Sequence, residues 1–550
     1  MRRKSALYSE RSSWDSHWKE ISEYQLPRAG RFFHTDRNQG KKRHNSIYDN
    51  TAMFSLRTLA AGMMAGMTSP ARPWFRLGIK DKDLMEAYPV KTWLHDTAEL
   101  IRAIYSQSNT YRALHSIYEE LGAFGTSANF VLPDFDNVIH NYPLTVGEYA
   151  LATNYKGEVD TIVREVDMTV AQIVRQFGLD NVTTTVKNMW DNGNYDAWIT
   201  VIHMVEPRRE RDVTKKDAKN KKFSSVYFEA GSDNPSRFLL ESGFNRFPAV
   251  TPRWVVTGND IYGTSPGMEC LGDVKQLQHE QFRKAQAIDY QVNPPLQVPS
   301  QYKDHTKARL PGGVFHVDAT SPGGGVRSAF EVNLNLQYLL ADIQDVRERI
   351  KSAYYADLFL MLANDTRSGI TATEVAERHE EKLLMLGPVL ERLHNELLSP
   401  MIDITFETCV EAGILPPIPK ELEGKEIEIE FISTLAQAQR AVAAQGMDQL
   451  ITRVGAIAGM KPEVIDKIDF DQMIDDTGDM FGVNPKLILP DNVVAQIRAD
   501  RAKQMQAQQM AAMMPTMADA AKTTSEVDTE GVQDVINMFQ GYGTPSPAQA

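Results

Sequence analysis

The spacing of apolar residues along the chain predicts helical regions on either side of a strand-rich one. Residues 47–130 favour helices, because 92–108 and 111–124 repeat apolar side chains at three- and four-residue steps. From about 128 to 263 the apolar runs are short, β-branched and bounded by Gly, Asn or Pro, which is typical of strands. The first half of the chain is therefore predicted to be α+β.

Two long helices are predicted next, with a Pro- and Gly-rich insert between them. Ser265 is a candidate N-cap, and Pro266 suits the first position of a helix that runs to about residue 290. A second helix is predicted over 332–361. This order predicts a helical hairpin that carries residues 291–331 as a small module at its tip. The second helix has an apolar stripe, at a spacing near 3.5 residues, formed by Leu336, Leu339, Leu340, Ile343, Val346, Ile350 and Tyr354.

The remaining residues are predicted to be mostly helical. A polar break at 362–370 precedes a third long helix, 371 to about 398, in which Pro388 should introduce a kink. Ala, Gln and Met dominate 433–515, which favours further helices. The final segment, 516–550, has the composition of a disordered tail.

Composition and charge narrow the class of protein. The chain has 550 residues, 42% of them hydrophobic and 24% charged, which is typical of a folded protein with several structural units. Its formal net charge of −13 argues against a protein whose main task is to bind nucleic acid tightly. Most of the excess lies in 401–550, which contain 11 Lys/Arg and 23 Asp/Glu. Residues 1–45 and 206–222 are basic instead; each is predicted to be a solvated loop or arm, with a partner-binding arm as the alternative.

The cysteine count and the N-terminus indicate a reducing compartment. Two cysteines cannot form a disulfide framework or a thiolate zinc site. We expect no signal peptide, because no apolar run follows the basic N-terminal residues, and no membrane span, because no window approaches the required ~20 apolar residues. Trp14 and Trp18, one helical turn apart, are predicted to pack together rather than to form a ligand cage.

The chemical motifs do not support an enzyme. Residues 263–267 match G-x-S-x-G, but the residue after Ser265 is Pro266, which lacks the backbone N–H that an oxyanion hole needs. A capped helix start is therefore favoured over a hydrolase. There is no Walker A motif, and His279 and His379 both lack the second histidine of a zinc-binding H-E-x-x-H helix. We expect no catalytic activity, no cofactor and no metal site.

Several sequence blocks, in a fixed order over residues 14–440, are more specific than any single motif. They include WDSHWKEISEYQLPRAGRFF (14–33), LAAGMMAGMTSPARPWFRL (59–77), YRALHSIYEELGAFGTS (111–127), GFNRFPAVTPRW (243–254), YGTSPGMECLGDVKQLQ (262–278), TATEVAER (371–378) and LGPVLERLHNELLSP (386–400). In these blocks the chain resembles the portal, or head-to-tail connector, proteins of short-tailed bacteriophages. Beyond residue 440 the resemblance is looser.

The resemblance implies a mainly α protein with an α+β wing. The expected portal-type fold has long stem helices, an inserted α/β clip and a helical crown, and it assembles as a ring of about twelve subunits. On this plan the parts are the wing 1–265 with its N-terminal arm 1–45, the stem helices 266–290 and 332–361, the clip 291–331, the tunnel loop 362–370, a connecting helix and strands 371–432, and the crown helices 433–515.

The resemblance also implies a function. Such a ring, assembled in the host cytoplasm, lies at one capsid vertex of the virion and is the channel for DNA packaging and ejection. The implied partners are further copies of the chain, double-stranded DNA, the large terminase subunit, the tail adaptor or head-completion protein, and the major capsid and scaffold proteins. The alternative is a non-enzymatic oligomeric scaffold or adaptor without a DNA channel.

Two groups of residues are candidate sites on this plan. The tunnel-loop candidates for contact with DNA are Asn364, Asp365, Thr366, Arg367 and Ser368. The clip candidates for docking of partners are Lys303, Asp304, His305, Lys307 and Arg309.

Overall fold

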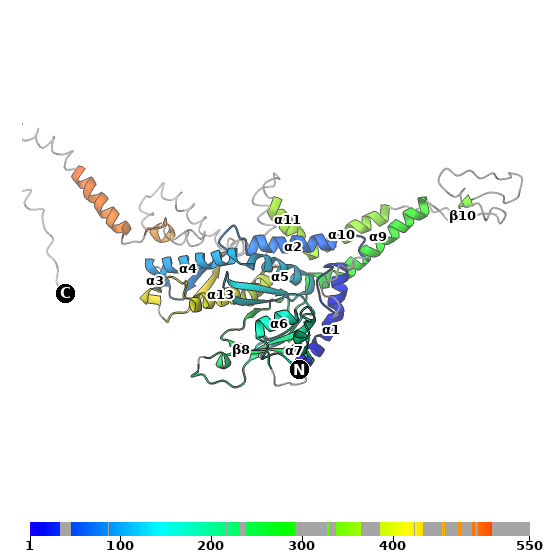
Figure 1. Ribbon diagram of the computed structural model, residues 1–550. Helices are drawn as coiled ribbons and strands as arrows, with labels where there is room; N and C mark the ends of the chain where they lie inside the picture. The colour runs from blue at the N-terminus through cyan, green and yellow to red at the C-terminus, as the bar shows by residue number, and fades with distance from the viewer. Residues whose placement is uncertain are drawn as a thin grey trace, which may run out of the picture. The chain divides into compact units, whose positions relative to one another are not determined.

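The computed structural model describes residues 1–32, 46–85, 87–215, 217–231, 238–292, 296–297, 327–328, 337–364, 386–422, 424–432, 454, 456, 470–474, 487–489 and 493–508 (Figure 1). The chain forms two compact units, Met1–Met85 with Trp93–Ile468, and Glu86–Thr92 with Asp469–Ala550. In the smaller unit residues 493–508 are helical, and Arg498 forms a two-pronged ion pair with Asp471 at 2.6 and 2.7 Å. The elements below belong to the larger unit, apart from the first turn of α4.

A five-stranded antiparallel sheet forms the strand-rich region that the sequence predicted. Its order is β4-β5-β6-β7-β8. Successive residues on a strand point to opposite faces, so Ile202 and Val201 on β6 belong to two separate apolar clusters. The strands are β4 (Tyr149–Thr153), β5 (Val159–Thr169), β6 (Trp198–Pro207), β7 (Phe223–Glu229) and β8 (Leu240–Phe244).

Helices cover both faces of this sheet. The helices α6 (Val170–Phe177) and α7 (Thr184–Asp191) bury their apolar residues with Val201. A capping box between Thr169 and Gln172 begins α6. The opposite face packs against Leu7 of α1 (Arg2–Tyr24).

The helix α1 corrects the expectation of an N-terminal arm over 1–45. Residues 2–24 are a helix whose Leu7, Trp18 and Ile21 are fully buried, and the indole N–H of Trp18 donates to the Phe124 carbonyl at 3.0 Å. The basic residues of this helix are not confined to its exposed side: Arg11 is buried with Leu7 and Trp18, whereas Arg2 and Arg3 are exposed. A charge count over the segment therefore did not show which of its residues are buried. The predicted packing of Trp14 on Trp18 is confirmed, with ring centroids 6.0 Å apart.

A second, smaller sheet packs against a pair of helices. Its order is β3-β2-β9, and β2 and β3 contact α5, which in turn packs on α2 (Figure 1). Separately, β1 pairs with β12, which is distant in the sequence, and Phe75 lies opposite Phe431. The elements are α2 (Thr51–Met67), β1 (Phe75–Ile79), α3 (Lys82–Met85), α4 (Tyr88–Gln107), α5 (Thr110–Phe124), β2 (Ala128–Asp134), β3 (Val138–Leu144), β9 (Ala249–Val250) and β12 (Ile427–Phe431).

The predicted helical hairpin is present. The helix α9 (Leu271–Val292) follows the short α8 (Pro266–Glu269), and it runs side by side with α10 (Gln337–Ala353) (Figure 1). Between them, β10 (Leu296–Gln297) pairs antiparallel with β11 (Arg327–Ser328). The two ends of the insert are therefore joined beside the ends of the helices.

The second long helix differs from the expected 332–361. It ends at Ala353, and a new helix, α11 (Ala356–Asn364), follows a turn at Tyr354–Tyr355. At this break Tyr355 has a φ of +53°, in the left-handed region that a continuous helix cannot include. Residues 362–364 are therefore still helical, so the predicted polar break does not begin at 362.

The third long helix does not end near 398 as expected. Residues 386–393 are helical, a π-helical turn follows (η5, His394–Leu398), and α13 (Ser399–Ala412) continues the chain to Gly413. Pro400 follows this π-helical turn, with only Ser399 between them. The start of this helix at 371 lies outside the described residues, as do 516–550 and most of 433–515.

The basic stretch 206–222 is a surface loop, as predicted. It connects β6 to β7 and contains one 3-10 turn (η2, Ala218–Asn220). A second such turn (η6, Lys420–Leu422) precedes β12.

Candidate functional site

The first helix of the hairpin begins at a buried cap. The Ser265 hydroxyl accepts from the Met268 N–H at 3.0 Å and donates to the Ala123 carbonyl at 2.7 Å. Pro266 lies in the first turn, as predicted. A hydroxyl that is fully buried and already donates to a carbonyl is part of the helix start, so the hairpin is fixed to the end of α5.

The two helices of the hairpin share an apolar seam. An ion pair between Arg349 and Asp273, at 3.3 Å, lies beside it. The predicted stripe on α10 is confirmed toward its C-terminal end, whereas Leu340 is 46% exposed. The buried residues of the seam are Leu271, Val274 and Leu277 from α9, and Ile343, Val346 and Ile350 from α10.

Asp49 joins both hairpin helices to the segment that begins α2. Its carboxylate accepts from the Arg347 guanidinium at 2.7 and 3.0 Å, from the Gln281 amide at 3.0 Å and from the Thr51 N–H at 2.9 Å. The Gln278 side chain accepts from the Asp49 N–H at 2.8 Å and donates to the Asp49 carbonyl at 2.9 Å. One carboxylate therefore sets the position of α2 relative to α9 and α10.

Electrostatics favour the ionised form of this carboxyl. Burial opposes ionisation, but the hydrogen bonds from Thr51 and Arg347 outweigh it and hold the pKa of Asp49 below its usual range. The aspartate is therefore charged at neutral pH, and the Arg347 pair is an ion pair.

A pair of like charges lies across the same helices. Partial burial, together with the neighbouring Asp342 carboxyl on α10, raises the pKa of Glu280 on α9. The Gln276 amide donates to Glu280 at 2.6 Å and opposes this shift. The contact between Glu280 and Asp342 therefore stabilises the hairpin less as the pH rises and Glu280 ionises.

The base of the hairpin is tied to α1 by polar contacts. The Tyr354 hydroxyl donates to the Gln25 side chain at 2.6 Å, and the Gln25 amide donates to the Gly267 carbonyl at 2.8 Å. Tyr354 is fully buried, which accounts for the turn at this point between α10 and α11.

The helix α11 packs closely on α2. A Cβ placed on Gly62 would lie 2.2 Å from the ring of Phe359, so only glycine allows this approach. This contact fixes the direction in which α11 leads the chain toward the segment 365–385.

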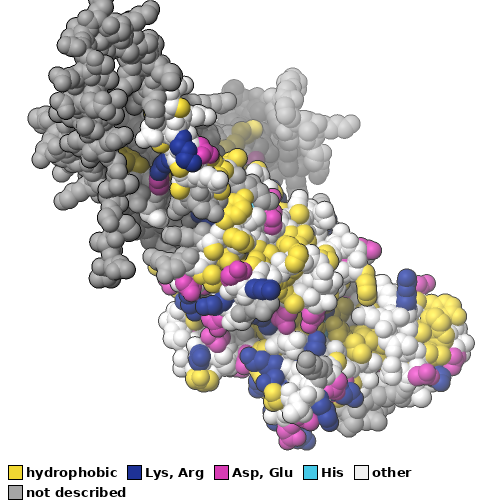
Figure 2. All heavy atoms as spheres, turned by 90° about the vertical axis from the view of Figure 1, so that its left-hand side faces the viewer, with side chains coloured by type: hydrophobic (Ala, Val, Ile, Leu, Met, Phe, Trp, Pro, Cys, Tyr) yellow, Lys and Arg dark blue, Asp and Glu magenta, His cyan; other side chains and the backbone are white. Residues whose placement is uncertain are grey.

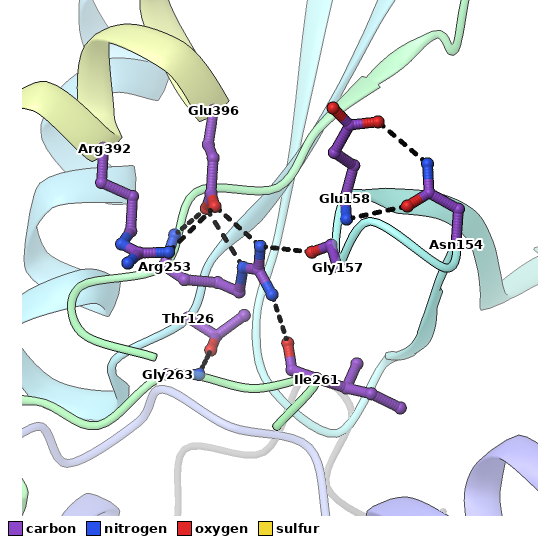
Figure 3. A network of polar contacts seen from close by, with 9 residues as sticks. All are labelled: Thr126, Asn154, Gly157, Glu158, Arg253, Ile261, Gly263, Arg392 and Glu396. Atoms are coloured by element: carbon purple, nitrogen blue, oxygen red, sulfur yellow. Dashed lines mark hydrogen bonds and ion pairs between the residues drawn. The ribbon is translucent and has the colours of Figure 1, made fainter. Parts of the chain in front are cut away.

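A buried arginine joins three loops to the π-helical turn (Figure 3). The Arg253 guanidinium donates to the Glu396 carboxylate at 2.7 and 3.1 Å, to the Gly157 carbonyl at 2.9 Å and to the Ile261 carbonyl at 3.4 Å. Arg392 contacts the same carboxylate at 3.4 Å. Glu396 lies in the π-helical turn, so the extra residue of that turn places a carboxylate on Arg253.

The geometry can be compared with known proteins. The model of a family described as bacteriophage head to tail connecting protein matches residues 1–489. The chain belongs to this family.

Curated relatives of this connector protein match almost its full length. A probable portal protein of Bordetella phage BPP-1 is 58% identical over 539 residues, which cover 98% of this chain and 97% of the relative. The portal protein of Salmonella phage epsilon15 is 45% identical over 540 residues, with the same two coverages.

Solved structures are more distant. The neck of an empty gene transfer agent particle aligns with a TM-score of 0.35 and 12% identity, over 74% of this chain and 86% of that one. The virion of a native gene transfer agent particle aligns with a TM-score of 0.32 and 12% identity, over 73% and 95%.

The candidate residues of the two predicted sites fall almost entirely outside the described residues. Asn364 is the last residue of α11, and the other four tunnel-loop candidates follow it. The five clip candidates, from Lys303 to Arg309, lie between β10 and β11. The structure therefore does not test these two sites, and the roles of their residues stay predictions.

Sequence reasoning missed the residues that hold the connector protein's hairpin and loops in place. Asp49 and Arg347 are 298 positions apart, and Arg253 and Glu396 are 143 apart. Neither pair belongs to a local motif. The available signal in the sequence was that Arg253 and Glu396 are charged residues that each lie inside a block resembling the portal proteins.

On the face drawn in Figure 2, the described residues do not concentrate charge of one sign. Figure 2 shows Lys/Arg and Asp/Glu side chains interspersed over one face, with hydrophobic side chains gathered between them. Among the described residues no group of three or more His, Cys, Asp or Glu side chains is placed to hold a metal ion. Within the same residues, no helix is long and apolar enough to cross a membrane.

Proposed function

We propose that this connector protein is the portal subunit of a phage head. About twelve copies close into a ring at one capsid vertex, and double-stranded DNA passes through the ring during packaging and ejection. The observation that carries this proposal is the match to two phage portal proteins over 98% of the chain.

The hairpin supports assembly into a ring. Its outer half exposes large apolar side chains, with exposed fractions from 36% for Phe282 to 81% for Tyr338. Such a surface on a protruding pair of helices favours burial against a neighbouring copy, and a heterologous contact of this kind repeats until the ring closes. The exposed residues are Phe282, Ile288, Tyr290, Val292, Tyr338 and Leu340.

The parts of the ring follow from this role. The hairpin α9–α10 is the stem, residues 291–331 are the clip, and the segment after Asn364 is the tunnel loop. In the clip, Lys303, Asp304, His305, Lys307 and Arg309 contact the large terminase subunit and later the tail adaptor. In the tunnel loop, Asn364, Asp365, Thr366, Arg367 and Ser368 contact DNA. Capsid and scaffold proteins contact the wing, residues 1–265, and the helices of 433–515 form the crown.

The net charge fits a conduit. Twelve copies of a −13 chain carry 12 × −13 = −156 charges. A channel lined by Lys and Arg would hold phosphates, whereas carboxylates repel them and let DNA slide in both directions. Neutralising channel-facing carboxylates should slow packaging, and unchanged packaging rate and DNA length would contradict this part of the proposal.

The remaining alternative is an oligomeric adaptor without a DNA channel. End-on electron-microscope class averages of the purified protein separate the two. A ring of about twelve subunits with a hole wide enough for duplex DNA supports the portal. Monomers or dimers that persist at high concentration in the presence of scaffold protein would favour the adaptor.

A further inference from the structure

A pocket of about 770 Å³ opens where β4 begins, beside Gly147 and Glu148. Its walls come from α1, from the segment after α1, from β3 and from β5. They include the side chains of Tyr8, Arg31, His140, Tyr142 and Arg164. None of these residues has a role in the proposed function above.

Among the described residues, none pairs with the edge of β5 at this pocket. The ladder between β4 and β5 ends at Tyr149 opposite Arg164, and beyond it the described strands pair β5 with β6 alone. The Glu165 N–H points away from β6, because it donates to the Glu148 carbonyl at 3.0 Å. Alternation along the strand turns the N–H and C=O of Asp167 to the same side, and no described residue forms a hydrogen bond with either group.

Arg164 is a buried cation at one side of this edge. The residue is 7% exposed, and its guanidinium lies 4.2 Å from the centroid of Phe130 and donates through Nε to His203 Nδ1 at 3.1 Å. Among the described residues no carboxylate lies within ion-pairing distance of it. A buried charge without a counter-charge is costly, which favours an anionic ligand.

His203 holds the guanidinium in place but cannot neutralise it. Burial, and then the charge of Arg164, lower the pKa of His203 well below its usual value. The neutral ring accepts from Arg164 at Nδ1, so its Nε2 carries the proton and donates to the Ser225 hydroxyl at 2.9 Å. The ring also stacks on Tyr227, with centroids 3.9 Å apart.

The carboxylates that line the pocket have other partners. Glu165 is paired with Lys4, Glu148 lies 3.8 Å from Arg31, and Asp167 accepts from the Thr200 hydroxyl at 2.8 Å. None of these carboxylates forms an ion pair with Arg164, and together they repel an ion of high negative charge such as phosphate. A single carboxylate on a larger ligand fits these walls better.

We propose that this pocket binds an extended peptide segment of a partner protein, as an added strand on the open edge of β5, and that Arg164 binds an acidic side chain of that peptide. The backbone groups of Asp167 supply the strand pairing, and the buried guanidinium selects Glu or Asp at one position. This inference does not depend on the ring or on the DNA channel.

The test uses purified full-length protein and fluorescence anisotropy of three labelled peptides. The first alternates Thr and Val around a central Glu, the second has Gln in place of Glu, and the third is the Glu peptide with alternate backbone amides methylated. We expect the Glu peptide to bind at least tenfold more tightly than either of the others. A change in the peptide leaves the protein intact, so this comparison does not depend on a variant that folds.

Two variants test whether Arg164 causes the preference for the Glu peptide. In Arg164→Gln the preference for Glu over Gln should disappear, while Arg175→Gln, an exposed arginine at the end of α6, should keep it. Equal binding of the Glu and Gln peptides, no measurable binding of the Glu peptide, or a preference that survives in Arg164→Gln would overturn the proposal. Equal binding of the methylated peptide, with displacement by inorganic phosphate, would instead show a simple anion site and would also overturn it.

Discussion

The Arg347 guanidinium and the Asp49 carboxylate lie 2.7 Å apart, although 298 positions separate them in the chain. Asp49 is almost fully buried, while Arg347 is partly open to solvent. The pair connects α10 to the start of α2, and Gln281 and Gln278 connect α9 to the same place. The position of the hairpin relative to α2 therefore depends in part on one carboxylate.

Asp49→Asn should loosen this junction. It leaves the shape of the side chain but removes its charge, so the free energy of unfolding should fall by about 1–3 kcal/mol. The control is Asp345→Asn, which removes an exposed carboxylate on α10 that pairs with Arg349, and which should cost about 1 kcal/mol or less. Urea unfolding measures both changes. Equal losses for the two variants would contradict the role given to Asp49.

The same pair predicts a pH dependence. Because the folded-state pKa of Asp49 is lowered, its contribution is present above the unfolded value of about 3.9 and is lost as pH falls through the folded value. The difference in unfolding free energy between the wild type and Asp49→Asn should therefore shrink as the pH is lowered from 7 toward 3. A difference that stays constant over this range would rule out an ionised Asp49.

Local signals predicted the helix starts and strand regions but not the contacts between distant segments. Ser265 and Pro266 identified the start of the hairpin because a cap is a property of adjacent residues. The π-helical turn at His394–Leu398 was missed because its energy comes from Glu396 reaching Arg253, which is 143 residues away. The break at Tyr355 was missed for the same reason, since Tyr354 bonds with Gln25. Family resemblance supplied the function, and no pattern of charge or periodicity would have done so.

Gly62→Ala should push α11 away from α2. The new Cβ would meet the Phe359 ring at 2.2 Å, and overpacking of this kind typically costs about 1–3 kcal/mol. Gly272→Ala is the matched control, because that helical glycine has open space around its Cβ position and should gain up to about 1 kcal/mol from helix propensity. Thermal unfolding shows whether each variant is destabilised or stabilised. A stabilised Gly62→Ala would show that α11 does not pack on α2 as described.

Glu396→Ala should be among the most destabilising changes in the connector protein. It leaves the Arg253 guanidinium buried without its counter-charge, and a broken buried pair costs about 3–5 kcal/mol. Asp403→Ala breaks the exposed pair with Arg246 and should cost about 1 kcal/mol or less. Urea unfolding of both, with the double variant Arg253→Met/Glu396→Leu, provides the check. The double variant should be more stable than Glu396→Ala, and the reverse order would show that packing, not charge, explains the loss.

Glu120 should make the free energy of unfolding fall as pH rises. Burial raises its pKa to about 8, while hydrogen bonds from the Thr145 hydroxyl, at 2.6 Å, and the Val146 N–H, at 3.4 Å, oppose this shift in part. Because the folded pKa lies above the unfolded value of about 4.3, the stabilising contribution is complete below that pH and is lost as pH rises through about 8. Glu120→Gln resembles the protonated form, so it should match the wild type near pH 4 and become relatively more stable above it. The gain should approach 1.4 kcal/mol per pH unit at most, measured by urea unfolding between pH 5 and 8. A flat difference for Glu120→Gln would mean that its carboxyl is already ionised in the folded protein.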